Sequence, residues 1–246
     1  MTSVLFGLHL DEFVEPPTIE AIRQSNPWNA DLPAVTTLPL VEIVQGGQTY
    51  NVPAVQFAIV RPDSRPLWSL KFTGYDIVVE CTAYSRWAEV WKTAAEYLTQ
   101  AFSLVRSVQE DVNIADFRLQ VTDQFAASVE RYNVDDLFNP ASQYLSPLAL
   151  DGRQLWNSAV GWFEDQGNVS FSDMLSVQVQ GHDNGTRIGA PYLVTIQHYG
   201  RATTAGEPVP EIDRLDDVIS TLHLRNKAAV SDLISQTMRE RIGLLP

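Results

Sequence analysis

Two kinds of hydrophobic spacing alternate along the chain, and together they predict an α+β fold. Between residues 55 and 83, apolar side chains occupy every second position in three runs that short turns separate. This period is typical of strands with one buried face, and connections this short require antiparallel hairpins. From about Arg86 to Ser107 the apolar spacing changes to three and four, which predicts a long amphipathic helix.

The segment before these hairpins is predicted to contain little regular structure. Val4 to Leu10 is expected to be a strand, and a short helix is expected from Ile19 to Gln24 with Thr18 as its N-cap. Prolines and a Gly-Gly pair are spread through residues 26–53, so we expect a long irregular loop there.

A similar order of elements returns in the second half. One expected strand, Leu155 to Phe163, carries large side chains on both faces, and Gly243 is a suitable C-cap for the last helical segment. The predicted elements are strands over 117–122, 155–163, 169–179 and 192–198, followed by helical spacing over 212–243.

The repeated order indicates how the chain is organised. We predict a single domain, 1–246, in which an antiparallel sheet is packed by long helices. Its possible internal halves are 1–110 and 111–246, each a β-βββ-α unit related to the other by duplication.

Composition and charge narrow the possible classes of protein. The chain has 246 residues, 45% of them hydrophobic, and a formal net charge of −13 that is divided almost equally between its halves. This composition excludes a disordered chain, and a single Cys excludes a disulfide scaffold or a Cys-based zinc site. Because phosphate binding needs clustered Lys and Arg, we expect no nucleic-acid partner.

The sequence contains neither a recognisable targeting signal nor a motif of known chemistry. The first residues form no signal peptide and no apolar run approaches a membrane span, so we expect a cytoplasmic protein without a membrane partner. The sequence holds no phosphate loop, dinucleotide fingerprint, HExxH, CxxC or GxSxG pattern. We therefore predict no cofactor and no metal ion, and no motif names a reaction.

Two places, one in each half of the chain, are candidates for ligand binding. Tyr84 and Arg86 flank a strand-to-helix junction, where an arginine near aromatic rings could bind an anion or a base. The alternative is that Trp87 belongs to the apolar stripe and Arg86 faces water. Asp173 and His198 fall on apolar faces of adjacent predicted strands, so they form either a buried acid–base pair or a structural core pair.

A third candidate lies on the predicted mid-chain loop. Tyr132, within Arg131-Tyr132-Asn133, could line a site. The same segment could equally cap the short helix that Asp135 begins.

The junction also carries a resemblance to a known family. Glu80 to Trp87, with its Tyr-x-x-Trp spacing, resembles the helix start of a sporadically distributed family of uncharacterised bacterial proteins of about this length. Members begin with a strand, a short helix and a Pro-rich loop. They have a Tyr-Asn segment similar to Tyr132-Asn133 and a Leu-x-x-x-His segment that Ile219 to His223 matches in part. The resemblance implies a bacterial origin and a repeated architecture, and no activity.

Three hypotheses about function follow. The first is a non-catalytic binding or protein-interaction module, which the acidic charge and the many aromatic residues favour. The second is a small-ligand-binding protein or enzyme with a cleft between sheet and helices. The third is a homo-oligomer that self-associates through sheet edges or through exposed aromatics on Leu155 to Phe163, where Trp156 and Trp162 share a face.

Overall fold

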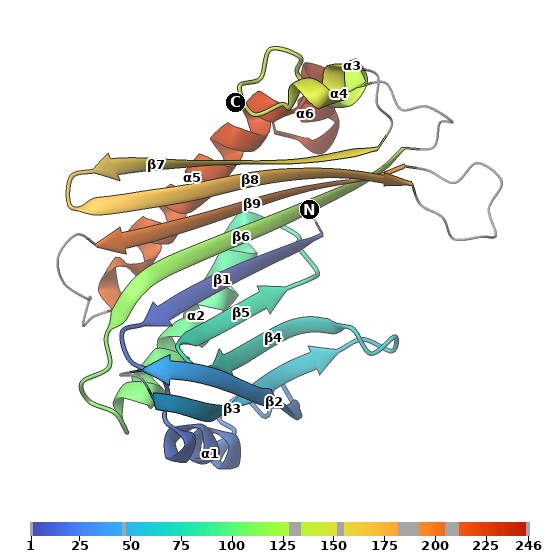
Figure 1. Ribbon diagram of the computed structural model, residues 1–246. Helices are drawn as coiled ribbons and strands as arrows, with labels where there is room; N and C mark the ends of the chain where they lie inside the picture. Colours follow the sequence, from blue (N-terminus) through green and yellow to red (C-terminus); the bar gives the residue numbers. More distant parts are fainter. Residues whose placement is uncertain are drawn as a thin grey trace.

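A computed structural model describes residues 2–45, 48–127, 134–151, 155–181, 192–204 and 212–244. The strands of this part form one antiparallel sheet in the order β2-β3-β4-β5-β1-β6-β9-β8-β7, with the two long helices on one face (Figure 1). The predicted α+β class with an antiparallel sheet is confirmed. The strands are β1 (Ser3–Leu10), β2 (Ala34–Gln45), β3 (Gln48–Val60), β4 (Pro66–Thr73), β5 (Asp76–Cys81), β6 (Ile114–Ala127), β7 (Trp156–Gln166), β8 (Val169–Gly181) and β9 (Tyr192–Thr204).

The helices differ greatly in length. The long ones, α2 (Trp87–Arg106) and α5 (Leu215–Leu233), each follow a group of hairpins, as the sequence predicted. No described helix combines the length and the apolar content that crossing a membrane requires. The shorter helices are α1 (Pro16–Ser25), α3 (Val134–Leu137), α4 (Pro147–Leu150), α6 (Gln236–Ile242) and the 3₁₀ turn η1 (Ile212–Arg214).

The sheet is arranged symmetrically about its centre, where β1 pairs with β6. Outward from β1 the neighbours are β5, β4, β3 and β2, and outward from β6 they are β9, β8 and β7. In each half the central strand comes first in the sequence, three hairpin strands return toward it from outside, and a long helix follows. The outermost strand β2 has no counterpart among the described strands of the second half.

Strand alternation places the core on the helix-covered face. In β1, Val4, Phe6 and Leu8 are buried beneath α2. The ring of Phe6 lies 5.6 Å from that of Trp87 and 5.2 Å from that of Trp91, measured between centroids. Because these two indoles lie one helical turn apart, the apolar stripe that predicted α2 is the surface that holds it on the sheet.

The opposite face carries a network of charged side chains. Asp116 on β6 is fully buried, and Arg118 Nε donates to its Oδ1 at 2.6 Å. The Arg201 Nε lies 2.9 Å from the other oxygen, and Arg118 also donates to Asp76 at 2.9 Å. His9 Nδ1 lies 2.7 Å from the same Asp76 oxygen. This network joins β1, β5, β6 and β9, so the sheet centre is held on both faces.

The expected loop over residues 26–53 is wrong, because β2 and the beginning of β3 lie there. β2 is an edge strand, and edge strands tolerate prolines that central strands exclude. The pairing of β2 with β3 shifts between Leu38 and Val41, which accommodates Pro39. Pro39 therefore marks an edge strand rather than the absence of a strand.

The predicted helix ends also need correction. Thr18 is not the N-cap of α1, because the helix begins at Pro16 and Thr18 is buried inside it. The helix α2 begins at Trp87 with Arg86 as its N-cap residue, one residue later than the predicted start. The continuous spacing over 212–243 is divided at Ser235, whose hydroxyl accepts a hydrogen bond from the Met238 N–H and so begins α6. Gly243 ends α6 with a φ of 72°, as predicted.

The helix α5 lies unusually close to β9. A Cβ on Gly200 would stand 3.1 Å from a methyl group of Leu222, which is tighter than most contacts that real Cβ atoms make. The absence of a side chain at position 200 thus lets Leu222 reach the sheet.

We expect Leu222→Ala to destabilise the protein by about 2–5 kcal/mol, because it empties a fully buried site between helix and sheet. Leu224→Ala is a matched control on the same helix, since Leu224 is 63% exposed, and should change stability by less than about 0.5 kcal/mol. Urea unfolding measures both. Equal losses would contradict the described packing of α5.

Candidate functional site

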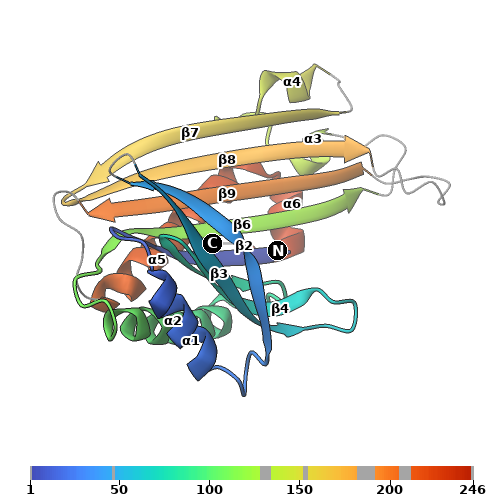
Figure 2. The ribbon, with the colours of Figure 1, turned by 60° about the horizontal axis from the view of Figure 1, so that its bottom comes forward.

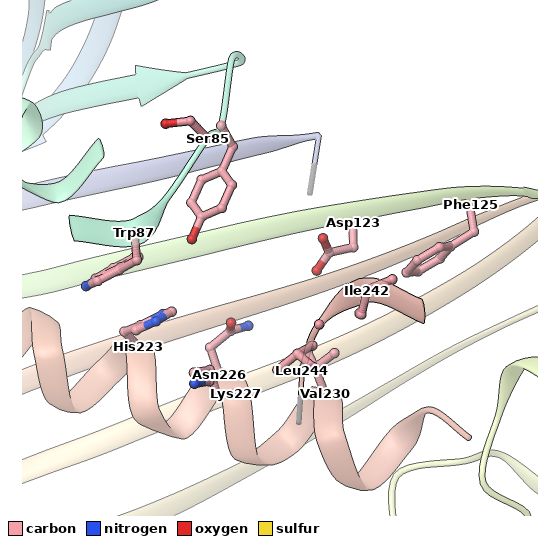
Figure 3. Close-up of a pocket in the computed structure, with 12 residues that line it drawn as sticks. Ser85, Trp87, Asp123, Phe125, His223, Asn226, Lys227, Val230, Ile242 and Leu244 are labelled. Atoms are coloured by element: carbon pink, nitrogen blue, oxygen red, sulfur yellow. The ribbon is translucent and has the colours of Figure 1, made fainter. Parts of the chain in front are cut away.

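A cavity of about 470 Å³ opens between the sheet and the helices near the sheet centre. Four parts of the chain form it: the β5–α2 junction, the second half of β6, the middle of α5 and the end of α6 (Figure 3). Its volume falls within the range of small-molecule sites. The lining residues are Tyr84, Ser85, Trp87, Asp123, Phe125, His223, Asn226, Lys227, Val230, Ile242, Gly243 and Leu244.

An aromatic stack forms one wall of the cavity. The ring of His223 lies parallel to the Trp87 indole, with 3.6 Å between centroids and 2° between planes (Figure 3). Burial, and to a smaller extent the charge of Lys227, lower the pKa of His223 to about 4. His223 is therefore neutral at neutral pH. Its Nδ1 atom is buried and has no hydrogen-bond partner among the described residues.

Polar groups from the helix and the sheet approach one another across the cavity. Asn226 on α5 is 4% exposed, and its Nδ2 is buried without a described partner. Asp123 on β6 is 8% exposed, and its carboxylate points toward the same space as the Asn226 amide (Figure 3). Tyr84 lies close enough that burial and the charge of Asp123 raise its pKa. Since a buried donor without a partner is costly, a ligand acceptor near Asn226 Nδ2 would be stabilising.

The rest of the lining is apolar. Phe125 follows Asp123 on the same face of β6, and Val230 lies one helical turn beyond Asn226 on α5. The end of α6 contributes Ile242 and Leu244. The cavity therefore has a polar side and an apolar side, which suits a ligand with both kinds of surface.

Of the two candidate residues at the β5–α2 junction, only one lines the cavity. Tyr84 lines the cavity, whereas Arg86 is exposed and does not. Trp87 lines the cavity and also belongs to the apolar stripe of α2. This position and the exposure of Arg86 agree with the alternative in which Trp87 lies on the stripe and Arg86 faces water.

Asp173 and His198 lie together but away from the cavity. His198 Nε2 is 3.3 Å from Asp173 Oδ1, and both side chains are fully buried. Arg225 on α5 donates to the second Asp173 oxygen at 2.7 Å and to Glu164 at 2.8 Å. Burial alone would raise the pKa of Asp173, but His198 and Arg225 hold it below its usual value. The arrangement joins α5 to β8 and β9, which is a structural role.

The remaining candidate, Tyr132, lies outside the described residues together with Arg131 and Asn133. Among the described residues, no three His, Cys, Asp or Glu side chains are grouped as a metal ion would require.

Sequence reasoning missed the cavity residues on α5 and the acidic residue on β6. Asn226 occupies a position four residues after Leu222, so it interrupts the apolar stripe of its helix. Asp123 likewise continues the buried alternation of Phe117, Leu119 and Val121 on β6. The sequence did contain a signal for both residues: each is polar at a position where the spacing of its helix or strand predicts an apolar side chain.

Comparisons with known proteins add no relative to this description. A scan against models of protein families finds no match, and a search of curated proteins finds no match either. The resemblance of the Tyr84–Trp87 junction to a bacterial family therefore stays a prediction.

The His223 pKa gives a stability prediction with a definite sign. Because the folded state lowers this pKa from 6.5 to about 4, protonation favours the unfolded chain. The contribution is complete above pH 6.5 and is lost progressively as the pH falls toward 4. His223→Phe keeps a ring against Trp87 and should flatten this part of the profile of unfolding free energy against pH. A wild-type NMR titration of the imidazole with a midpoint near 6.5 would contradict the burial.

Arg225 is expected to be essential for stability. Arg225→Met leaves the fully buried Asp173 without its cation, which should cost about 3–5 kcal/mol of unfolding free energy. Glu164→Gln removes the other partner of the same guanidinium, but Glu164 is 49% exposed, so its loss should cost at most about 1 kcal/mol. Chemical denaturation of both variants measures the difference, and a larger loss for Glu164→Gln would refute the assignment.

Proposed function

We propose that this protein binds a small amphipathic molecule, without a chemical step, in the cavity between β6 and α5. The observation that carries the proposal is the buried Asn226 Nδ2, which faces a cavity of about 470 Å³ and has no described partner. Natural proteins rarely leave a buried donor unsatisfied, and such groups at a pocket are explained by a ligand or by water.

The lining indicates which chemistry the ligand carries. It needs a hydrogen-bond acceptor for Asn226 Nδ2 and a polar group that pairs with His223 Nδ1, which accepts or donates according to the tautomer of the neutral ring. It also needs an apolar part that packs against Phe125, Val230 and Leu244. A neutral molecule with a hydroxyl or amide group beside a hydrocarbon or aromatic body meets these requirements.

Binding is favoured over catalysis by the position of the acid–base candidates. Asp173 and His198 are buried outside the cavity, and Arg225 already engages Asp173. The cleft hypothesis thus has more support than the protein-interaction module that the acidic charge favoured, which stays a prediction.

Origin and location belong to the same proposal. We infer that the two halves descend from a duplicated β-βββ-α unit, and the matching strand orders on either side of the β1–β6 centre support this. On this view β2 was added to the first half. We propose a cytoplasmic location, which the single cysteine fits.

A ligand screen followed by cavity variants tests the function. Small molecules of the described class should raise the melting temperature of the wild-type protein, and calorimetry should then give their affinities. Asn226→Leu removes the donor at nearly constant size and should weaken binding about tenfold, or 1.4 kcal/mol. Val230→Trp should abolish binding by filling the apolar side.

The control for bulk is Leu224→Trp, which places the same side chain on the exposed side of α5. It should leave the affinity unchanged. Binding that neither Asn226→Leu nor Val230→Trp alters, in folded variants, would mean that the ligand occupies another place and that the proposal is wrong.

A further inference from the structure

The last strand of the sheet, β7, has an open edge. Every residue of β7 pairs with β8, from Trp156 opposite Val179 to Gln166 opposite Val169, without a register shift. Among the described residues no strand pairs with its other side, and Figures 1 and 2 show it at the border of the sheet. The free N–H and C=O groups of such an edge are a template for another strand.

The two edges of the sheet differ in protection. The opposite edge strand, β2, contains Pro39 and a register shift between Leu38 and Val41, both of which discourage pairing with a further strand. β7 has neither a proline nor a shift, and it holds no lysine. Since natural proteins usually blunt a free edge, the unprotected one is the edge that a partner strand would use.

Two large apolar side chains project from β7 on one face. Phe163 is 86% exposed and Leu155, directly before the strand, is 58% exposed. Side chains of a strand alternate between its two faces, so Leu155 and Phe163 lie on the same face. Asn157, Ala159 and Gly161 lie on that face as well.

The tryptophans that suggested an interface from the sequence lie on the other face. Trp156 is 7% exposed and packs on Phe138, and Trp162 is half-buried against Tyr144. Both tryptophans pack against the core. The exposed aromatic side chain of this strand is therefore Phe163.

We propose that β7 pairs antiparallel with β7 of a second copy of this chain, in a two-fold register centred on Ala159. Positions 155 and 163 are equally far from 159, so this register sets Phe163 of each copy opposite Leu155 of the other. The same symmetry sets Asn157 opposite Gly161, where the missing side chain leaves room. The two exposed apolar side chains of β7 thus complement each other only through a second copy.

The charges favour the same register. Residues 155–163 carry no charged side chain, in a chain whose net charge of −13 makes two copies repel elsewhere. Glu164 and Asp165 lie just beyond the paired stretch. Pairing about Ala159 separates the two Glu164 positions by ten residues, roughly 34 Å at 3.4 Å per residue. This is well beyond the screening length of about 10 Å at 0.1 M salt.

An interface one strand wide is smaller than that of an obligate dimer, so the dimer forms in a concentration-dependent equilibrium. The inference does not depend on the cavity or its ligand.

Cysteine crosslinking tests the register. Ala159→Cys places a thiol at the two-fold centre, opposite itself, and oxidation should join two copies. Cys81 is fully buried and stays out of the reaction. Asn157→Cys alone should not crosslink, but mixed with Gly161→Cys it should give a mixed dimer. Leu224→Cys is the exposed control on α5. Crosslinking of Ala159→Cys no faster than that control overturns the proposal.

Sedimentation equilibrium gives the second measurement. The wild-type chain should show a monomer–dimer equilibrium, and Phe163→Ser should weaken it at least about tenfold, because it removes the large apolar side chain that faces Leu155 of the other copy. Leu224→Ser likewise replaces an exposed apolar side chain with serine, but on α5, and should leave the equilibrium unaltered. A wild-type chain that sediments as a monomer at every concentration overturns the proposal, including the case in which β7 serves a different protein.

Discussion

The packing of aromatic rings around Trp87 is the interaction on which the rest of the structure depends. The Trp87 ring contacts three other rings. These are Phe6 on strand β1, Trp91 on the same helix α2, and His223 on α5, whose ring is parallel to the indole. The Trp91 indole N–H donates to Asp216 on α5 at 2.8 Å. Two long helices that are distant in sequence are thereby joined above the central strand β1.

This junction also explains where the cavity lies. The rings hold α2 and α5 together at one point, and beyond that point Asn226 and Val230 continue along α5 over the second half of β6. The space between is closed by α6, which exists as a separate element because Ser235 restarts the helix. The aromatic contact, the polar stretch of α5 and the separate helix α6 together form the walls of the cavity.

The sequence revealed those parts of the fold in which the two faces of an element differ. The stripe of α2 and the alternation in β3, β4 and β5 were correctly predicted because water lies on one side and the core on the other. β2 was missed because an edge strand buries little and admits Pro39, so its pattern resembled a loop. The division at Ser235 was missed because the apolar spacing continues through it: Leu233, Ile234 and Met238 are all buried.

The site was less predictable than the fold, because its residues come from four segments that only the sheet topology brings together. Tyr84 could be suspected from its place at a junction, whereas Asn226 and Asp123 show their role only where their elements face each other. Asp173 and His198 could be placed on adjacent strand faces from the sequence, but Arg225, which forms an ion pair with Asp173, lies far along the chain.

Gly200 on β9 determines how closely the sheet and the helix α5 approach each other. It does not line the cavity, yet a Cβ there would stand 3.1 Å from Leu222 and 3.3 Å from Asp173. A larger residue would require Leu222 and Asp173 to shift. Position 200 therefore sets how closely α5 can pack on β9, one residue before His223 in the wall of the cavity.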